Sequence, residues 1–213
     1  MGDGRAAETG AGPAPELLLD RQLGEFDAGQ MNAVLVDAPV DETYRAVRAL
    51  DPDQVARSVP FMRLMGAVRG LPAGIAARVR RKTRSAPETL SADEYREAFI
   101  LLDEKPGVEF VVGMIGKFMT ATQLEFRRFA PHEFASFDAP GFGKVALNFL
   151  VQPYGTDRSL LTTETRTATT DPVSRARFQR YWRVIGPFAG MIMRRWVTLA
   201  KLNAEQAAPR NAT

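Results

Sequence analysis

The stretch DPVSRARFQRYWRVIGPFAGMIMRRWVTLAKLNAE, residues 171–205, decides the fold. Asp171 is a good N-cap, and Pro172 is favoured in the first turn of a helix. Large apolar side chains then recur every three or four residues and fall on one stripe of a helix. They are Phe178, Trp182, Ile185, Ala189, Ile192, Met193 and Trp196. The stretch therefore predicts one amphipathic helix, roughly 50 Å long if it continues to about residue 205.

The pair Gly186-Pro187 interrupts this helix. Pro187 has no N–H to donate to the carbonyl of Arg183, so we expect a kink at this point. Because Pro187 falls on the polar side of the helix, the helix is expected to bend around whatever its aromatic stripe contacts.

The chain before the helix is rich in β-forming residues. The runs 31–36, 98–102, 108–115, 122–129, 134–137, 145–152 and 160–168 are predicted strands. Turn signals at Pro106-Gly107 and at 153–157 favour hairpins between neighbouring runs. Two short helices are expected after the first strand, one containing Tyr44 and Val47 and one opened by Asp51-Pro52.

This order of elements is α+β, not alternating strand and helix. We expect a curved antiparallel sheet that wraps around the long kinked C-terminal helix. A sheet that curls around one helix buries its concave face without closing fully, which favours a cavity between the two. In a chain of 213 residues, we expect one domain at 21–206, between flexible tails at 1–20 and 207–213.

Composition excludes several classes of function. With no cysteine, disulfides and thiolate metal sites are excluded, and the one histidine, His132, is interpreted as a loop residue. We expect no metal and no cofactor. No apolar run approaches the roughly 18 residues that a transmembrane helix needs, and the N-terminus does not resemble a secretory signal. A cytoplasmic location is therefore the expectation.

The net charge of +3 is too small to indicate nucleic-acid binding. Basic residues gather at 69–84, where aromatic residues are not interleaved, which argues against single-stranded nucleic acid. Three interpretations remain for this segment: a solvated loop, a lid facing an anionic ligand, or weak contact with an acidic membrane surface. The oligomeric state is not predicted.

Several segments carry a family resemblance. They are LTTETRT at 161–167, Asp171, RFQRYWR at 177–183, IGP at 185–187, FVVGMIGKF at 110–118, GFGKV at 141–145 and Asn148-Phe149. Taken in chain order, over about residues 24–205, these segments resemble an actinobacterial-type branch of the START/SRPBCC superfamily. That superfamily includes lipid carriers, polyketide cyclases, plant hormone-binding proteins and ring-hydroxylating oxygenases. The chain departs from the oxygenases because one histidine cannot build a two-histidine iron site.

The resemblance implies a helix-grip (START-like) fold, an apolar cavity and no catalytic motif. We expect the cavity to be lined by Phe110, Val112, Met114, Asn148, Glu164, Arg166, Phe178, Tyr181, Trp182, Ile185, Ala189, Ile192 and Trp196. The same aromatic stripe could instead simply fill a core.

The polar residues in this set have two interpretations. Glu164 and Arg166 share one face of their strand. If that face is concave, they are buried charges that must pair or bind something, and if it is convex, they are a solvated pair. Asn148 bonds either a ligand or a strand neighbour. Glu104 and Glu109 are interpreted as surface carboxylates at a hairpin end.

Three functions follow as hypotheses. The first is binding or carriage of an apolar, lipid-like or polyketide-like molecule. The second is an enzyme of the polyketide cyclase/dehydrase type, in which Glu164 or Arg166 would move protons. The third is a protein-interaction module without a ligand, which would show an exposed apolar patch in place of a cavity.

Overall fold

The computed structural model describes residues 16–51, 54–55, 98–120 and 123–208, without the side chains at 119–120, 123–124, 184–185 and 188. Six strands form one curved antiparallel sheet in the order β1-β6-β5-β3-β2, with β4 also paired to β3. The strands are β1 (Ala28–Val36), β2 (Ile100–Lys105), β3 (Glu109–Thr120), β4 (Gln123–Arg127), β5 (Gly143–Pro153) and β6 (Ser159–Thr169). The helices are α1 (Leu18–Gln22), α2 (Val40–Arg48) and α7 (Pro172–Ala207), with a short 3₁₀ helix η1 at Pro131–Glu133.

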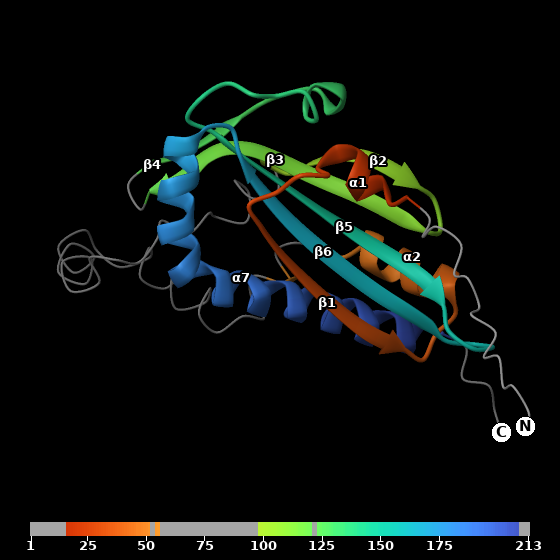
Figure 1. Ribbon diagram of the computed structural model, residues 1–213. Coiled ribbons are helices and arrows are strands. Elements are labelled where there is room, and N and C mark those ends of the chain that lie inside the picture. Colours follow the sequence, from red (N-terminus) through yellow and green to blue (C-terminus); the bar gives the residue numbers. More distant parts are fainter. Residues whose placement is uncertain (1–15, 52–53, 56–97, 121–122, 209–213) are drawn as a thin grey trace, which may run out of the picture.

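The two faces of the sheet are covered by different elements (Figure 1). Successive side chains of a strand point to opposite faces. On β3, Phe110 packs with residues of α2 and α7, whereas Val111 packs with residues of α1 and with Phe134. We call the face that packs on α2 and α7 the inner face, and the face beneath α1 the outer face.

Helix α7 begins where its sequence predicts. The Asp171 carboxylate accepts hydrogen bonds from the backbone N–H groups of Val173 and Ser174, both at 2.9 Å. The helix continues to Ala207 and is clearly bent (Figure 1). The expected long, kinked C-terminal helix is confirmed, with Pro187 inside it.

The two arms of α7 pack into separate clusters of the inner face. The N-terminal arm contributes Phe178, which is buried with Met114 and Phe118 of β3. The C-terminal arm contributes buried residues to a larger cluster that also contains α2 and the middle of β5. These are Met193, Trp196, Val197, Ala200 and Ala204. The bend therefore lets one helix reach two parts of a curved surface.

The outer face has a cover of its own. Leu18, Leu19 and Leu23 are buried against Val111, Ile115 and Ala146 of the sheet. The expected boundary of a tail at residue 20 is wrong, since the run of leucines supplies an apolar side for α1. Residues 1–15 and 209–213 lie outside the described residues.

The expected strand at 134–137 is also wrong. These residues form a turn after η1, and the Phe134 side chain is fully buried on the outer face. The Lys144 ammonium of β5 donates to the Ala135 carbonyl at 2.9 Å and holds this turn against the sheet. Residues 134–137 therefore belong to a loop that packs against the outer face, and they do not pair with the sheet.

The remaining strand predictions are confirmed with shifts of a few residues, as is the first short helix, α2. Of the second short helix, residues 54–55 are described and are helical. The basic segment 69–84 lies outside the described residues. In the described part of the chain, no helix is both long enough and apolar enough to cross a membrane.

Candidate functional site

A hollow lies between the inner face and α7. Its first compartment, here called the aromatic chamber, has a volume of about 220 Å³. The described residues that line it come from β1, β3, β5, β6 and both arms of α7. They are Gln30, Phe99, Met114, Phe118, Val145, Leu147, Thr165, Thr167, Phe178, Tyr181, Trp182, Ala189, Ile192 and Met193.

A second compartment, the α2 chamber, has a volume of about 530 Å³. Its described lining is Val47, Arg48, Leu50, Asp51, Phe99, Phe110, Val112, Leu147, Phe149 and Trp196. Phe99 and Leu147 line both chambers, so the two are neighbours. One elongated molecule could reach from one to the other.

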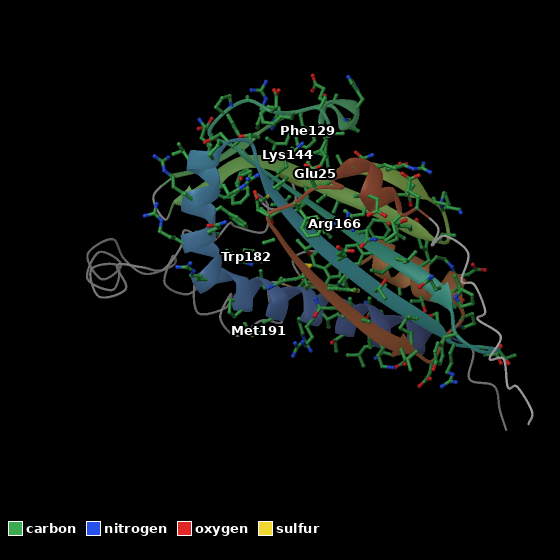
Figure 2. All side chains as sticks on the ribbon, viewed as in Figure 1. Glu25, Phe129, Lys144, Arg166, Trp182 and Met191 are labelled. Atoms are coloured by element: carbon green, nitrogen blue, oxygen red, sulfur yellow. The ribbon has the colours of Figure 1, made fainter. Side chains whose placement is uncertain are left out.

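Aromatic rings form the α7 wall of the aromatic chamber. The rings of Phe178 and Trp182 lie 5.4 Å apart, centroid to centroid, and Trp182 lies near the bend of α7 in Figure 2. A Cβ placed on Gly186 would be 3.2 Å from the Trp182 indole, so the glycine leaves room for this ring. Burial raises the pKa of the Tyr181 phenol, which therefore stays neutral at physiological pH.

Two polar side chains of this chamber differ in their partners. The Gln30 amide donates to the Gly186 carbonyl at 2.7 Å and ties β1 to the bend of α7. The Thr165 hydroxyl of β6 is buried and has no hydrogen-bond partner among the described residues. A buried hydroxyl without a partner is unusual in a folded protein and calls for a physical explanation.

The α2 chamber has a charged margin. Glu104 accepts hydrogen bonds from the Tyr44 hydroxyl at 2.6 Å and from the Arg48 guanidinium at 3.0 Å. These two bonds, that from Arg48 first, lower the pKa of Glu104. Burial, and then the bond to Glu104, raise the pKa of Tyr44. Glu104 is therefore a partnered group beside the chamber, not the free surface carboxylate that its hairpin position suggested.

The expectation that Asn148, Glu164 and Arg166 line the cavity is wrong. Asn148 is paired with Glu164 across β5 and β6, and both belong to the outer face, as does Arg166 two residues further on. Figure 2 shows Arg166 on the same side of the sheet as α1. The threonines that alternate with Glu164 and Arg166 face inward instead, and Thr165 and Thr167 line the aromatic chamber.

The outer-face residues form a buried network that holds α1. The Arg166 guanidinium donates to Glu164 at 2.7 Å, to Asp20 at 2.8 Å and to the Leu23 carbonyl at 3.0 Å. Its side chain is 8% exposed, so the pair is not the solvated one expected on a convex surface. Helix α1 covers this part of the outer face. The pair is therefore neither in the cavity nor fully solvated, which were the two alternatives.

Glu109 belongs to the same network and is only 4% exposed, which overturns its assignment to the surface. Its carboxylate accepts from the Asn148 amide at 2.7 Å and from the Leu18 backbone N–H at 2.9 Å. The other end of the Asn148 side chain accepts from the Glu164 backbone N–H at 2.9 Å. Asn148 therefore bonds neighbours in the fold, as one of its two interpretations required.

The other expected residues divide between the two chambers. Met114, Phe178, Tyr181, Trp182, Ala189 and Ile192 line the aromatic chamber, and Phe110, Val112 and Trp196 line the α2 chamber. The side chain of Ile185 lies outside the described part of the structure.

Sequence reasoning missed Gln30, Phe118, Thr165 and Thr167, and also Arg48 and Asp51. The apolar run Val145, Leu147, Phe149, on one face of β5, was a signal that could have oriented the adjoining strand.

No protein-family model and no curated protein matches the chain. Among solved structures it is similar to a conserved protein from Geobacillus kaustophilus, with 10% identity, 84% of this chain and 97% of the other covered, and a TM-score of 0.41. It is also similar to norcoclaurine synthase from Thalictrum flavum, with 12% identity, coverages of 85% and 96%, and a TM-score of 0.34. A third is the Zhui aromatase/cyclase from Streptomyces, with 11% identity, coverages of 84% and 94%, and a TM-score of 0.30. These similarities concern the fold alone.

Proposed function

We propose that the protein binds an apolar small molecule, lipid-like or polyketide-like, between its sheet and α7, and that it acts as a binding or carrier protein. The observation that carries this proposal is the aromatic chamber: a hollow remains where the aromatic stripe of α7 meets the inner face. A side chain from each arm of α7 lines it, for example Phe178 and Ile192, so the stripe does more than fill a core.

The size and lining of the hollow suit such a ligand. An engineered apolar cavity of roughly 150 Å³ is enough to bind benzene. The aromatic chamber, at about 220 Å³, is larger, and the α2 chamber adjoins it. Burial of apolar surface at about 25 cal/mol per Å² would supply the affinity.

The cyclase hypothesis loses the residues on which it relied. Glu164 and Arg166 belong to the outer face and are paired with one another. Among the described residues lining the chambers, the ionisable ones are Tyr181, Arg48 and Asp51. Burial raises the pKa of the Tyr181 phenol, so little of the phenolate that could accept a proton is present at neutral pH. Binding therefore accounts for more of the geometry than proton transfer does.

Two measurements test the proposal. Native mass spectrometry of protein purified from its own host should show a bound molecule, and N-phenyl-1-naphthylamine, a neutral apolar fluorophore, should bind saturably. Ala189→Phe places a ring into the aromatic chamber and should weaken the fluorophore about tenfold or more, because the added ring occupies the same space.

The matched control is Ala176→Phe, the same substitution at an exposed position of α7, which should leave the affinity unchanged. Absence of both a co-purifying molecule and a saturable fluorophore signal would refute the proposed function. An equal effect of the two variants would place the fluorophore elsewhere on the protein.

A further inference from the structure

We propose that the exposed side of the N-terminal arm of α7 docks on a membrane surface that carries anionic lipids. The arm is the part of α7 before Gly186 and Pro187, and it stands at one end of the molecule (Figure 1). Its exposed side lies outside the two chambers, so the docking surface does not depend on what the chambers bind.

The charge of this arm has one sign. Between residues 172 and 193 the charged side chains are Arg175, Arg177, Arg180 and Arg183, and the sequence has no carboxylate there. The whole chain is nearly balanced, with 28 Lys and Arg against 25 Asp and Glu and a net charge of +3. The arm alone therefore carries more positive charge than the chain has in excess. Such a concentration creates a local positive potential that attracts an anionic surface.

The helical period directs these arginines away from the core. Phe178 and Trp182 line the aromatic chamber on one side of the arm. Arg180 and Arg183 fall on the opposite side, Arg177 falls on the flank, and all three are exposed. None of the three forms an ion pair with a carboxylate of the described residues. Their guanidinium groups are therefore accessible to a partner.

Three described carboxylates at this end of the molecule already have partners. Asp171 accepts the hydrogen bonds of the helix cap. Asp27 accepts from the Arg175 guanidinium at 2.6 Å. Glu125, on the strand β4 that packs beside the arm, is paired with Lys117 at 3.0 Å. The charge of the other three arginines of the arm is therefore not compensated by these carboxylates.

Apolar side chains on the same side favour lipid as the partner. Val173 is 60% exposed, and Ala176, one turn further along, is exposed as well. A helix whose exposed side mixes arginine with apolar residues is typical of segments that lie in a membrane interface. There the apolar side chains enter the acyl boundary, and each arginine near an anionic leaflet strengthens binding about fivefold. An acidic protein would attract the arginines but would offer less to Val173.

Vesicle flotation of the full chain tests this surface. One set of vesicles is phosphatidylcholine alone, and the other contains equal parts of phosphatidylcholine and phosphatidylserine. Wild type should bind the mixed vesicles about tenfold more tightly than the neutral ones, or better. Raising the salt from about 0.1 M to about 1 M should remove most of this difference, because the Debye length falls from about 10 Å to about 3 Å.

Two double variants with the same loss of charge locate the surface. Arg180→Gln with Arg183→Gln should weaken binding to the mixed vesicles about tenfold or more. Arg45→Gln with Arg158→Gln removes two exposed arginines elsewhere and should stay within about twofold of wild type. Ala176→Glu, which adds a carboxylate between the arginines of the arm, should also weaken binding. All of these positions are exposed, so the urea midpoints should stay close to that of wild type.

Four results would overturn the proposal. The first is equal binding of wild type to both kinds of vesicle, and the second is equal weakening by the two double variants. The third is the absence of binding to either vesicle. The fourth is binding of soluble poly-glutamate, lost in the double variant of the arm, without binding to vesicles, which would indicate an acidic protein as the partner. None of these results bears on the proposed function, which is tested by the fluorophore and by native mass spectrometry.

Discussion

Strand β6 carries polar residues on both faces, and the two faces use them in different ways. On the outer face, Arg166 has three hydrogen-bond acceptors around it, and α1 is held in place by them. On the inner face, Thr165 lines a hollow, while its hydroxyl oxygen is buried and has no partner among the described residues. A satisfied network stabilises the fold, whereas a buried hydroxyl without a partner lowers its stability.

The largest effect that separates the two faces is expected at Arg166. Arg166→Met keeps the length of the side chain but leaves Glu164 and Asp20 without their cation. Loss of a buried guanidinium that bonds two partly exposed carboxylates and a carbonyl should lower the free energy of unfolding by about 2–3 kcal/mol, measured by urea denaturation. The affinity for N-phenyl-1-naphthylamine should stay within about twofold of wild type, because the inner face is untouched.

Arg177→Met, at an exposed position of α7, is the matched control and should change stability little. A comparable loss in both variants, or a large loss of fluorophore affinity in Arg166→Met, would contradict the separation of the two faces.

The next effect is expected at Glu109. Both of its carboxylate oxygens accept hydrogen bonds, from Asn148 and from the Leu18 backbone. Glu109→Gln puts an amide N–H₂ against one of these two donors, which should cost about 2 kcal/mol. Amide hydrogen exchange at Leu18 and Leu19 should accelerate, since α1 loses part of its attachment. Glu25→Gln, at an exposed position, should change neither quantity.

Two threonines of the inner face give a smaller effect, with opposite signs. Thr163→Val removes a hydroxyl that donates to the Asn148 carbonyl and should lower the free energy of unfolding by about 1 kcal/mol. Thr165→Val replaces an unpaired buried hydroxyl by a methyl group and should be neutral or raise stability by up to about 1 kcal/mol without ligand. Equal destabilisation by both variants would show that Thr165 has a partner in the fold.

The smallest effect concerns the cap of α7 and depends on pH. Hydrogen bonds from Ser174, first from its hydroxyl, and from Gly141 lower the pKa of Asp171 from 3.8 to about 2. A carboxyl with a lowered pKa contributes stability above its unfolded value, and that contribution is lost as the pH falls from about 4 to about 2. Wild type should therefore exceed Asp171→Asn in urea midpoint at pH 6, and the difference should narrow by pH 2.5. A difference independent of pH would contradict this assignment.

The sequence predicted the inner side of this molecule better than its outer side. The period of α7, its cap and Pro187 are local properties, so the bent helix could be predicted from residues 171–205. The inward face of β6 could not be, because threonine, glutamate and arginine alternate there without a clear apolar side. The outcome depended on α1, more than a hundred residues away, whose leucines cover the outer face. Such long-range contacts give no local signal, so Asn148, Glu164 and Arg166 were placed in the cavity.

The bend of α7 also has a mechanical consequence. Its N-terminal arm packs in one buried cluster and its C-terminal arm in another, and the aromatic chamber has walls from both. A molecule that fills the chamber would therefore contact both arms at once, across a bend where the Gln30 amide already ties β1 to the Gly186 carbonyl. Binding would then restrain the N-terminal arm around Phe178 and the C-terminal arm around Ile192 together, and the melting temperature would rise with the concentration of the ligand.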